Sequence, residues 1–159
     1  MRSATPIIVR HYADVDSDFV GALAAEAFSE YDGDARRAGS KVVAMVSAKR
    51  THTLVAERSS RPVGFVSFDV TGEGAHISAI AVVRGERGRG IGARLLGAAE
   101  KLAQTLGANV VTLETGEANL AALDLFIRAG YRIEGRTPRY YTTGYDALTL
   151  RRSLTSSRA

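Results

Sequence analysis

The segment 82–92, with the sequence VVRGERGRGIG, restricts the possible folds of this chain more than any other part of it. An alternating and then apolar run precedes it at 75–83, and a helix-forming run follows at 93–106. Glycine removes the steric barrier to positive φ and lets the backbone approach a ligand closely. Three glycines alternate through the segment, at Gly88, Gly90 and Gly92. The pattern therefore predicts a strand, a tight turn and a helix in direct succession.

The same segment has the properties of a binding site for a phosphate group. Amides at a helix N-terminus are unpaired donors at the positive end of the helix dipole, and they bind anions. Arginines surround them, at Arg84, Arg87, Arg89 and Arg94. Glycines in a loop serve turn geometry as often as they serve a ligand, so the glycines alone leave both interpretations open. The succession of strand, turn and helix favours a ligand.

Two common nucleotide sites do not match this segment. A P-loop requires Gly-Lys followed by Ser or Thr, but here Ile91 and Ala93 follow Gly90 and Gly92. A dinucleotide-binding fold places its glycine turn after the first strand, whereas this turn lies past the middle of the 159 residues. The phosphate ligand is therefore expected to belong to another class.

Hydrophobic periodicity and turn residues predict an alternation of strands and helices along the chain. Strands are expected at 6–12, 51–57, 63–70, 75–83, 108–115, 131–136 and 145–152. Helices are expected from the acidic run 14–18 to Phe28, over 40–50 and 93–106, and after Asn119, with a polar break at 29–39. This order, β-α-α-β-β-β-α-β-α-β-β, predicts an α/β fold (an α+β mixed sheet) with helices on both faces. One domain is expected over 1–152, followed by a flexible tail at 153–159.

Composition limits the remaining classes. A chain of 159 residues with 45% hydrophobic content is long enough for one well-buried core. The absence of Cys removes disulfides, a thiol nucleophile and Cys-bound metal, and three dispersed His do not predict a metal site. The net charge of +4 is small and partly located in the turn, so nucleic-acid binding is not expected. The sequence shows neither an apolar run that could span a bilayer nor the apolar core of a secretory signal, so a cytoplasmic protein without membrane attachment is expected.

Two motifs give the chain a resemblance to the GNAT superfamily of N-acetyltransferases. The acetyl-CoA-binding signature of that family is Arg or Gln, two residues, Gly, one residue, then Gly or Ala, and Arg87, Gly90 and Gly92 fill these places. The family's later helix motif is matched by Asn119, Ala122, Leu125, Phe126, Gly130 and Tyr131. Weaker similarities indicate the ribosomal-protein N-terminal acetyltransferase branch. The resemblance implies a single-domain GNAT-like fold and transfer of an acetyl group from acetyl-CoA to an amine.

The resemblance also implies a set of residues that bind acetyl-CoA. Backbone groups of the strand before the turn, at Ile80, Ala81 and Val82, are expected to pair with the pantetheine amides as an added strand would. The pyrophosphate is expected on Arg87, Gly88, Arg89, Gly90, Ile91 and Gly92. Asn119 is a good helix cap on any fold, and in the family it also contacts the cofactor. No metal is implied.

Acetyl transfer from a thioester needs a base for the amine, a donor to the oxyanion and a proton for the thiolate. The resemblance implies Glu114 as the base and the Val82 amide as the oxyanion donor, although a Glu at a strand end is equally often a solvated side chain. Weaker candidates for the base are Glu73, Glu117 and His76. Tyr140 and Tyr141 match a pair that lies beside the peptide substrate in the N-terminal acetyltransferase branch, so they could contact the acceptor or supply the proton.

Phe126 is where the sequence departs from the family pattern. Members of the family often carry a Tyr there as the acid, whereas a Phe has no proton to donate and could instead pack on the pantetheine arm. A thiolate of intrinsic pKa about 8.5 can also leave without protonation. Two hypotheses follow: an N-acetyltransferase acting on a protein N-terminus or a small amine, which could be a homodimer, and an acyl-CoA-binding module without catalysis. A nucleic-acid binder is a third and less favoured hypothesis.

Overall fold

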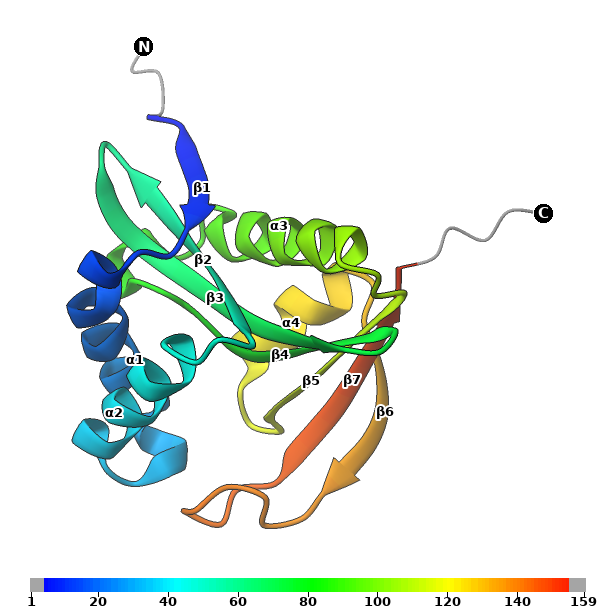
Figure 1. Cartoon of the computed structure of the whole chain (residues 1–159). Coiled ribbons are helices and arrows are strands. Elements are labelled where there is room, and N and C mark those ends of the chain that lie inside the picture. The colour runs from blue at the N-terminus through cyan, green and yellow to red at the C-terminus, as the bar shows by residue number, and fades with distance from the viewer. Residues whose placement is uncertain (1–4, 155–159) are drawn as a thin grey trace.

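The computed structural model describes residues 5–154, which form one mixed sheet with helices on both faces (Figure 1). The strand order is β1-β2-β3-β4-β5-β7-β6, and every neighbouring pair is antiparallel except the parallel pair β4 and β5. The strands are β1 (Ile7–His11), β2 (Thr51–Arg58), β3 (Arg61–Thr71), β4 (Gly74–Val82), β5 (Val110–Gly116), β6 (Arg132–Thr137) and β7 (Ala147–Ser153). The helices are α1 (Ser17–Asp32), α2 (Ala35–Val46), α3 (Ile91–Thr105) and α4 (Leu120–Arg128). Short 3-10 turns lie at Asp14–Asp16 and Arg84–Glu86.

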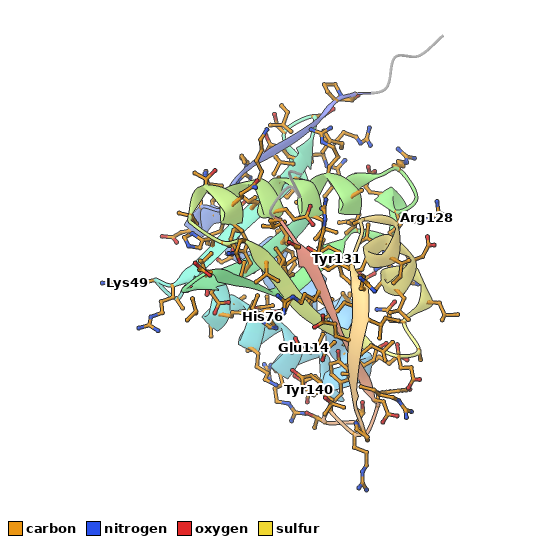
Figure 2. All side chains as sticks on the ribbon, turned by 90° about the vertical axis from the view of Figure 1, so that its right-hand side faces the viewer. Lys49, His76, Glu114, Arg128, Tyr131 and Tyr140 are labelled. Atoms are coloured by element: carbon orange, nitrogen blue, oxygen red, sulfur yellow. The ribbon has the colours of Figure 1, made fainter. Side chains whose placement is uncertain are left out.

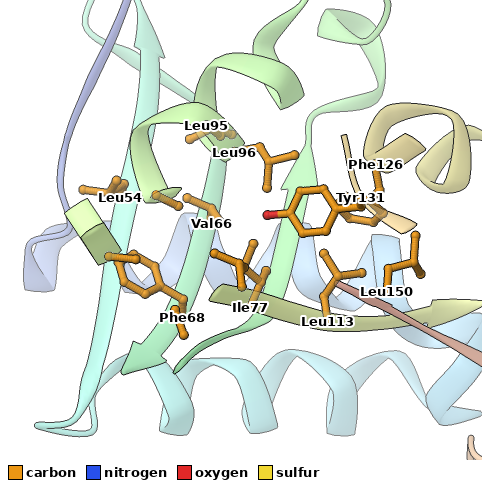
Figure 3. Packing of buried hydrophobic residues seen from close by; sticks show 14 of the residues in the cluster. Leu54, Val66, Phe68, Ile77, Leu95, Leu96, Leu113, Phe126, Tyr131 and Leu150 are labelled. Carbon is orange, nitrogen blue, oxygen red and sulfur yellow. The ribbon is translucent and has the colours of Figure 1, made fainter. Parts of the chain in front are cut away.

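The sheet separates two hydrophobic cores because successive side chains of a strand point to opposite faces. The larger core lies under α3 and α4, where Leu95, Leu96 and Phe126 pack against Val66 and Leu113 of the sheet (Figure 3). The smaller core lies under α1 and α2 on the other face. Its buried members are Val20, Leu23, Ala24, Val46, Val55, Phe65, Ala79 and Ala81. Both faces of the central strands are therefore covered, as the predicted element order requires.

The structure confirms the predicted order of elements and the predicted fold class. The predicted break at 29–39 is wrong. Helix α1 continues to Asp32 and ends at Gly33, whose φ of +86° stops the helix. Helix α2 then starts at once, because the Asp34 carboxylate accepts a hydrogen bond of 2.9 Å from the Arg37 amide and caps it. The polar residues that suggested a loop are the cap and the exposed first turn of a helix.

Two further differences concern the ends of elements. The predicted helix 40–50 is wrong at both ends, since α2 starts five residues earlier and residues 47–50 form turns. Ser153, which was expected to lie in the tail, belongs to β7, and residues 155–159 lie outside the described part of the chain. Within residues 5–154, none of the helices is both long and apolar enough to cross a membrane.

Candidate active site

The parallel strands β4 and β5 pair over only four residues and then diverge. Their pairing runs from Gly74 opposite Val110 to Ile77 opposite Leu113 and then stops, although both strands continue. Figure 1 shows the two strands separating beyond this point. Ser78 follows directly as a bulge, because Ile77 and Ala79 have partners on β3 and Ser78 has none. The divergence leaves one edge of β4 without a neighbouring strand over 78–82.

The backbone groups on this open edge can be assigned from the β3 pairing. The Val83 amide donates to the Val63 carbonyl at 2.9 Å, so the backbone groups of Val83 face β3. Because successive residues of a strand point their backbone groups to alternate sides, those of Ile80 and Val82 face the gap, and those of Ala81 face β3. Of the three residues expected to pair with pantetheine amides, the geometry favours Ile80 and Val82 over Ala81.

The glycine turn after β4 leaves the first amides of α3 free. Gly88 and Gly90 have φ of +79° and +81°, and a Cβ built on either would meet nothing within 4 Å. Gly90 is the residue before α3, and no side chain caps the helix there. The turn therefore offers free backbone donors of the kind that bind an anion. The expected positive φ at Gly92 is wrong, because Gly92 lies within α3.

Gly92 serves helix packing. A Cβ on it would lie 3.2 Å from a methyl carbon of Leu125, so its small size lets α3 approach α4 closely. Ile91 is 1% exposed and belongs to the larger core, so only its backbone is available at the turn. Packing of Ile91 and Gly92 against the core therefore holds the turn in place and leaves its free amides uncovered.

The four arginines near the turn have different surroundings. Arg87 donates from Nε to the Val82 carbonyl at 3.1 Å, and its side chain remains exposed beside the turn. Arg94 donates to the Ile7 carbonyl at 3.0 Å and so ties α3 to β1. Arg84 lies 3.6 Å from the Glu26 carboxylate. Arg89 is exposed and has no hydrogen bond or ion pair among residues 5–154, so Arg87 and Arg89 are the arginines between β4 and α3 that have no carboxylate partner there.

A cleft of about 470 Å³ opens where β4 and β5 separate. The diverging strands form its floor, one face of α1 and α2 forms a side, and residues 140–142 cover another side. Six of the residues expected to bind the cofactor or the acceptor, or to act in catalysis, line it together: Ile80, Glu114, Asn119, Phe126, Tyr140 and Tyr141. The other charged side chains that line it, Asp32 and Lys41, were not anticipated. Helical spacing on α2 was the available signal, since Lys41 shares a face with Val42 and Met45.

Glu114 and His76 form a close pair beside the cleft floor. The His76 Nε2 atom lies 2.5 Å from the Glu114 Oε2 atom, and Figure 2 shows both side chains in the same part of the molecule as Tyr140. The side chains are partly exposed, 44% for His76 and 25% for Glu114. The other two candidate bases lie elsewhere, with Glu73 near Asn109 and Glu117 paired with Arg136. The geometry therefore favours Glu114 over these alternatives.

Four tyrosines form an aromatic cluster next to Glu114. The Tyr141 ring centroid lies 4.6 Å from that of Tyr31 and 4.9 Å from that of Tyr140, and Tyr145 lies 5.3 Å from Tyr31. Burial raises the pKa of Tyr140 and of Tyr141, and the nearby Glu114 carboxylate raises each further. Both phenols consequently keep their protons at neutral pH and can donate hydrogen bonds.

The loop that carries Tyr140 and Tyr141 is attached to α1. Thr143 donates from its hydroxyl to the Glu30 carbonyl at 2.9 Å and also reaches the Tyr31 carbonyl at 3.2 Å. At its base, the Asp146 carboxylate accepts from the Arg139 amide at 2.8 Å. The Thr143 bonds join α1 to the segment between β6 and β7, and these two parts of the chain are more than 100 residues apart.

Asn119 and Phe126 hold α4 against the cleft. The Asn119 side chain accepts from the Ala122 amide at 3.2 Å and so caps α4, while also lining the cleft. Phe126 is 3% exposed and contacts the edge of the Tyr131 ring at 5.8 Å between centroids. The Tyr131 hydroxyl donates to the buried Glu100 at 2.8 Å and is therefore committed to the core. Tyr131 does not replace the acid missing at Phe126.

The family of the chain is decided by a comparison over most of its length. The model of the acetyltransferase (GNAT) family matches residues 11–131. The chain belongs to this family. A GNAT-family relative, an uncharacterized N-acetyltransferase of Methanocaldococcus jannaschii, is 30% identical over 91% of this chain and 90% of its own. The catalytic subunit of the N-terminal acetyltransferase A complex of Arabidopsis thaliana is 32% identical over 64% of this chain, which spans 56% of that protein.

Several solved structures share the fold. The Ard1 protein of Thermoplasma volcanium has a TM-score of 0.82 at 22% identity, covering 94% of this chain and 99% of its own. The yncA protein of Salmonella typhimurium, solved with its cofactor acetyl-CoA, has a TM-score of 0.80 at 17% identity, covering 96% of each chain. The ribosomal-protein-S18-alanine N-acetyltransferase of Escherichia coli has a TM-score of 0.75 at 18% identity, covering 96% of this chain and 97% of its own.

The protein is thus an acetyl-CoA-dependent N-acetyltransferase, and its own residues fit that cofactor. The uncapped α3 terminus, with open space above Gly88 and Gly90, suits a pyrophosphate. The unpaired edge of β4 presents amide and carbonyl groups to a chain of amides such as pantetheine. No group of three or more His, Cys, Asp or Glu side chains that could hold a metal ion occurs among the described residues.

Proposed function

We propose that this GNAT-family enzyme acetylates the α-amine at the N-terminus of a peptide or protein. The observation that carries the proposal is the position of Glu114, on the floor of a cleft that joins the open edge of β4 to the tyrosine cluster. An amine entering between the tyrosines would meet this carboxylate. Support also comes from the relatives in Arabidopsis thaliana and Escherichia coli, whose names place them among enzymes of protein N-termini or ribosomal proteins.

Donor binding is proposed at two backbone surfaces. Ile80 and Val82 would pair with the pantetheine amides, and the amides after Gly90 would bind the pyrophosphate with Arg87 and Arg89 beside it. When bound, acetyl-CoA supplies a thioester, whose acetyl carbon is open to attack by an amine. Val82, the oxyanion donor expected from the sequence, is used by the pantetheine in this arrangement and does not line the cleft beside Glu114. The Ile80 amide faces the gap within the cleft and is proposed to donate to the acetyl oxygen as negative charge develops there.

Glu114 is proposed as the base that takes the proton from the attacking amine. An N-terminal amine has a pKa near 7.7–8.0, so part of it is protonated at neutral pH and a nearby carboxylate assists its loss of a proton. The nitrogen then forms a bond to the acetyl carbon as the bond from carbon to sulfur breaks. His76, 2.5 Å from Glu114 and exposed on the other side, would hold the carboxylate and pass protons to solvent.

Tyr140 and Tyr141 are proposed to position the acceptor. Their phenols stay protonated next to Glu114 and can donate to the backbone carbonyls of a peptide. Either hydroxyl could also protonate the thiolate, since Phe126 has no proton to give. Phe126 is proposed to pack on the pantetheine arm, because it lines the cleft from α4.

The test is a thiol-release assay with acetyl-CoA and a panel of acceptors. The panel holds short peptides with free N-termini, the same peptides with blocked N-termini and an internal Lys, and small primary amines. The proposal expects turnover on free N-termini and none on the blocked peptides. Turnover confined to Lys side chains or small amines would reject an N-terminal acceptor.

A second function is favoured by one observation, the Phe at position 126 in place of an acid. An acyl-CoA-binding module without catalysis would bind CoA tightly and release no thiol with any acceptor. The assay above, combined with a calorimetric measurement of CoA affinity, separates the two functions.

A further inference from the structure

The end of α1 and the start of α2 carry one carboxylate between two cations. The Asp32 carboxylate accepts from the Arg37 Nε atom at 2.6 Å, and the Lys41 Nζ atom lies 3.4 Å from its other oxygen. Arg37 also donates to the Asp32 backbone carbonyl at 2.6 Å, so its guanidinium is fixed. The Arg37 guanidinium holds the pKa of Asp32 below its usual range, and the carboxylate stays ionised. Arg37 is thus the tightly bound partner of Asp32, and Lys41 is the loosely bound one.

Lys41 is the member of this group that can turn to a ligand. Its contact with Asp32 is the longer of the two, and its side chain is 65% exposed whereas Asp32 is nearly buried. Lys41 also lines the acceptor cleft, on the same α2 face as Val42 and Met45. Lys41 therefore brings a positive charge to the side of the cleft, on a flexible side chain that Asp32 holds only loosely.

The floor of the cleft has the opposite charge. Glu114 lies there, and the remaining lining is mostly aromatic and apolar, including Phe28, Tyr31 and Tyr141. Charges that are separated by apolar side chains interact with a ligand more strongly than they would in open water. The cleft is thus matched to an acceptor with a positive amine and a negative group close to it.

We infer that the preferred acceptor is a peptide with an acidic side chain at its second or third residue, and that Lys41 determines this preference by pairing with the carboxylate. This inference rests on the proposed N-terminal acceptor and specifies the charge that the acceptor carries close to its amine. Lys41 acts on specificity alone, since the amine and the thioester meet at Glu114 and the β4 edge. The ion pair would replace the loose contact of Lys41 with Asp32.

The test uses peptides that differ at one position only, with Glu, Gln or Lys as the second residue, and a parallel set varied at the third. The inference expects kcat/KM to be about fivefold higher for Glu than for Gln, and lower again for Lys, which is the size of effect that one partly exposed ion pair gives. The preference should shrink at high salt, because salt screens such pairs. Lys41→Met should abolish it, and Lys41→Glu should reverse it.

Lys49→Glu is the matched control. It makes the same change of charge just beyond α2, where Figure 2 shows Lys49 at the periphery and far from Glu114 and Tyr140. This variant should keep the preference for Glu. Unchanged CoA affinity in all three variants would show that they are folded.

Peptide affinity is measured separately on CoA-saturated protein. Absence of transfer to every peptide would reject the proposed function, and the affinities would still report whether Glu is preferred over Gln. Equal affinities and rates for the Glu and Gln peptides, or a preference that survives Lys41→Glu, would overturn the inference about charge. A free acidic amino acid that is used as well as the peptides would also overturn it.

Discussion

Tyr31 lies across Gly116 so closely that a Cβ on Gly116 would come within 2.7 Å of the Tyr31 Cζ atom. Gly116 ends β5 and Tyr31 belongs to the last turn of α1, so this contact joins the floor of the cleft to its side. The absence of a side chain on Gly116 is what allows the Tyr31 ring to pack against the tilted Tyr141 ring, with 4.6 Å between the ring centroids. The shape of the proposed acceptor side of the cleft, where Tyr31 and Tyr141 lie, therefore depends on the absence of a methyl group at Gly116.

Gly116→Ala should weaken acceptor binding without affecting the donor. The new methyl group displaces the Tyr31 ring, which can swing away because it is the end of a side chain, so stability should fall by only about 1 kcal/mol. We expect the acceptor KM to rise severalfold and CoA affinity to stay constant. Gly135→Ala is the control, since a Cβ there would meet only Thr149, at 4.0 Å. Equal effects of the two variants on KM would contradict this role of Gly116.

Gly90→Asp should abolish donor binding. The substitution places a side chain at φ +81° and a negative charge at the free amides of α3. Gly72→Asp is the control variant. Gly72 also has a positive φ, of +60°, and open space around it, but it lies in the turn between β3 and β4. Both variants should lose about 1–2 kcal/mol of stability from the backbone conformation. Only Gly90→Asp should lose CoA affinity in a calorimetric titration, and intact affinity in that variant would reject the anion site.

Glu114→Gln should lower kcat/KM by about a hundredfold, the usual contribution of a general base. The remaining activity should rise steeply with pH, because the free amine becomes plentiful only above its pKa of about 8. A complete pH profile of both proteins measures this. Glu73→Gln, outside the cleft, should behave as the unchanged protein. A Glu114→Gln profile that parallels the original would exclude Glu114 as the base.

Thr143→Val should loosen the loop that carries Tyr140 and Tyr141. It keeps the shape of the side chain and removes the hydroxyl that donates to the Glu30 and Tyr31 carbonyls. We expect a rise in acceptor KM and a loss of about 1 kcal/mol of stability, with unchanged CoA affinity. Thr105→Val removes a hydroxyl bonded only within α3 and should leave KM unaltered. Identical KM values for the two variants would show that the loop does not need this attachment.

Asp16→Asn should make the protein less sensitive to acid. Asp16 is buried and accepts 2.8 Å hydrogen bonds from Arg10 and from the Ala13 amide, and the bonds from Arg10 above all hold its pKa below the usual range. A lowered pKa in the folded state contributes stability above the unfolded value of about 3.9, and this contribution is lost as pH falls through the folded value.

The substitution should therefore cost about 2 kcal/mol at pH 7, and the cost should shrink below about pH 4. Urea unfolding at a series of pH values measures it, with the exposed Asp14→Asn as control. A cost for Asp16→Asn that stays constant from pH 7 to pH 3 would contradict the assignment.

The sequence predicted the parts of this fold that local patterns control. Gly88 and Gly90 adopt the expected positive φ, and Asn119 caps the expected helix. The start of α2 was missed because Asp34 caps a helix whose first turn is charged, and such a turn has the composition of a loop.

The acceptor side of the cleft depends on contacts between residues that are far apart in the sequence, and a local sequence pattern does not predict such contacts. His76 and Glu114 are 38 residues apart, and they meet because β4 and β5 are parallel and in a register that the sequence does not encode locally. Tyr31 and Lys41 were overlooked for the same reason, since each helix reveals its own buried face and not the cleft beside it. The donor side was more accessible, because one continuous segment builds the turn.

Where β4 and β5 separate, the proposed donor side and acceptor side of the site are built from different chemical groups. On the donor side the groups offered to the ligand are mainly main-chain amides and carbonyls, which most substitutions leave in place and which only Pro or a change of backbone conformation removes. On the acceptor side they are side chains such as Lys41 and Tyr141, each of which a single codon change can replace. An enzyme built in this way can change the amine that it acetylates in small steps while its use of acetyl-CoA stays constant.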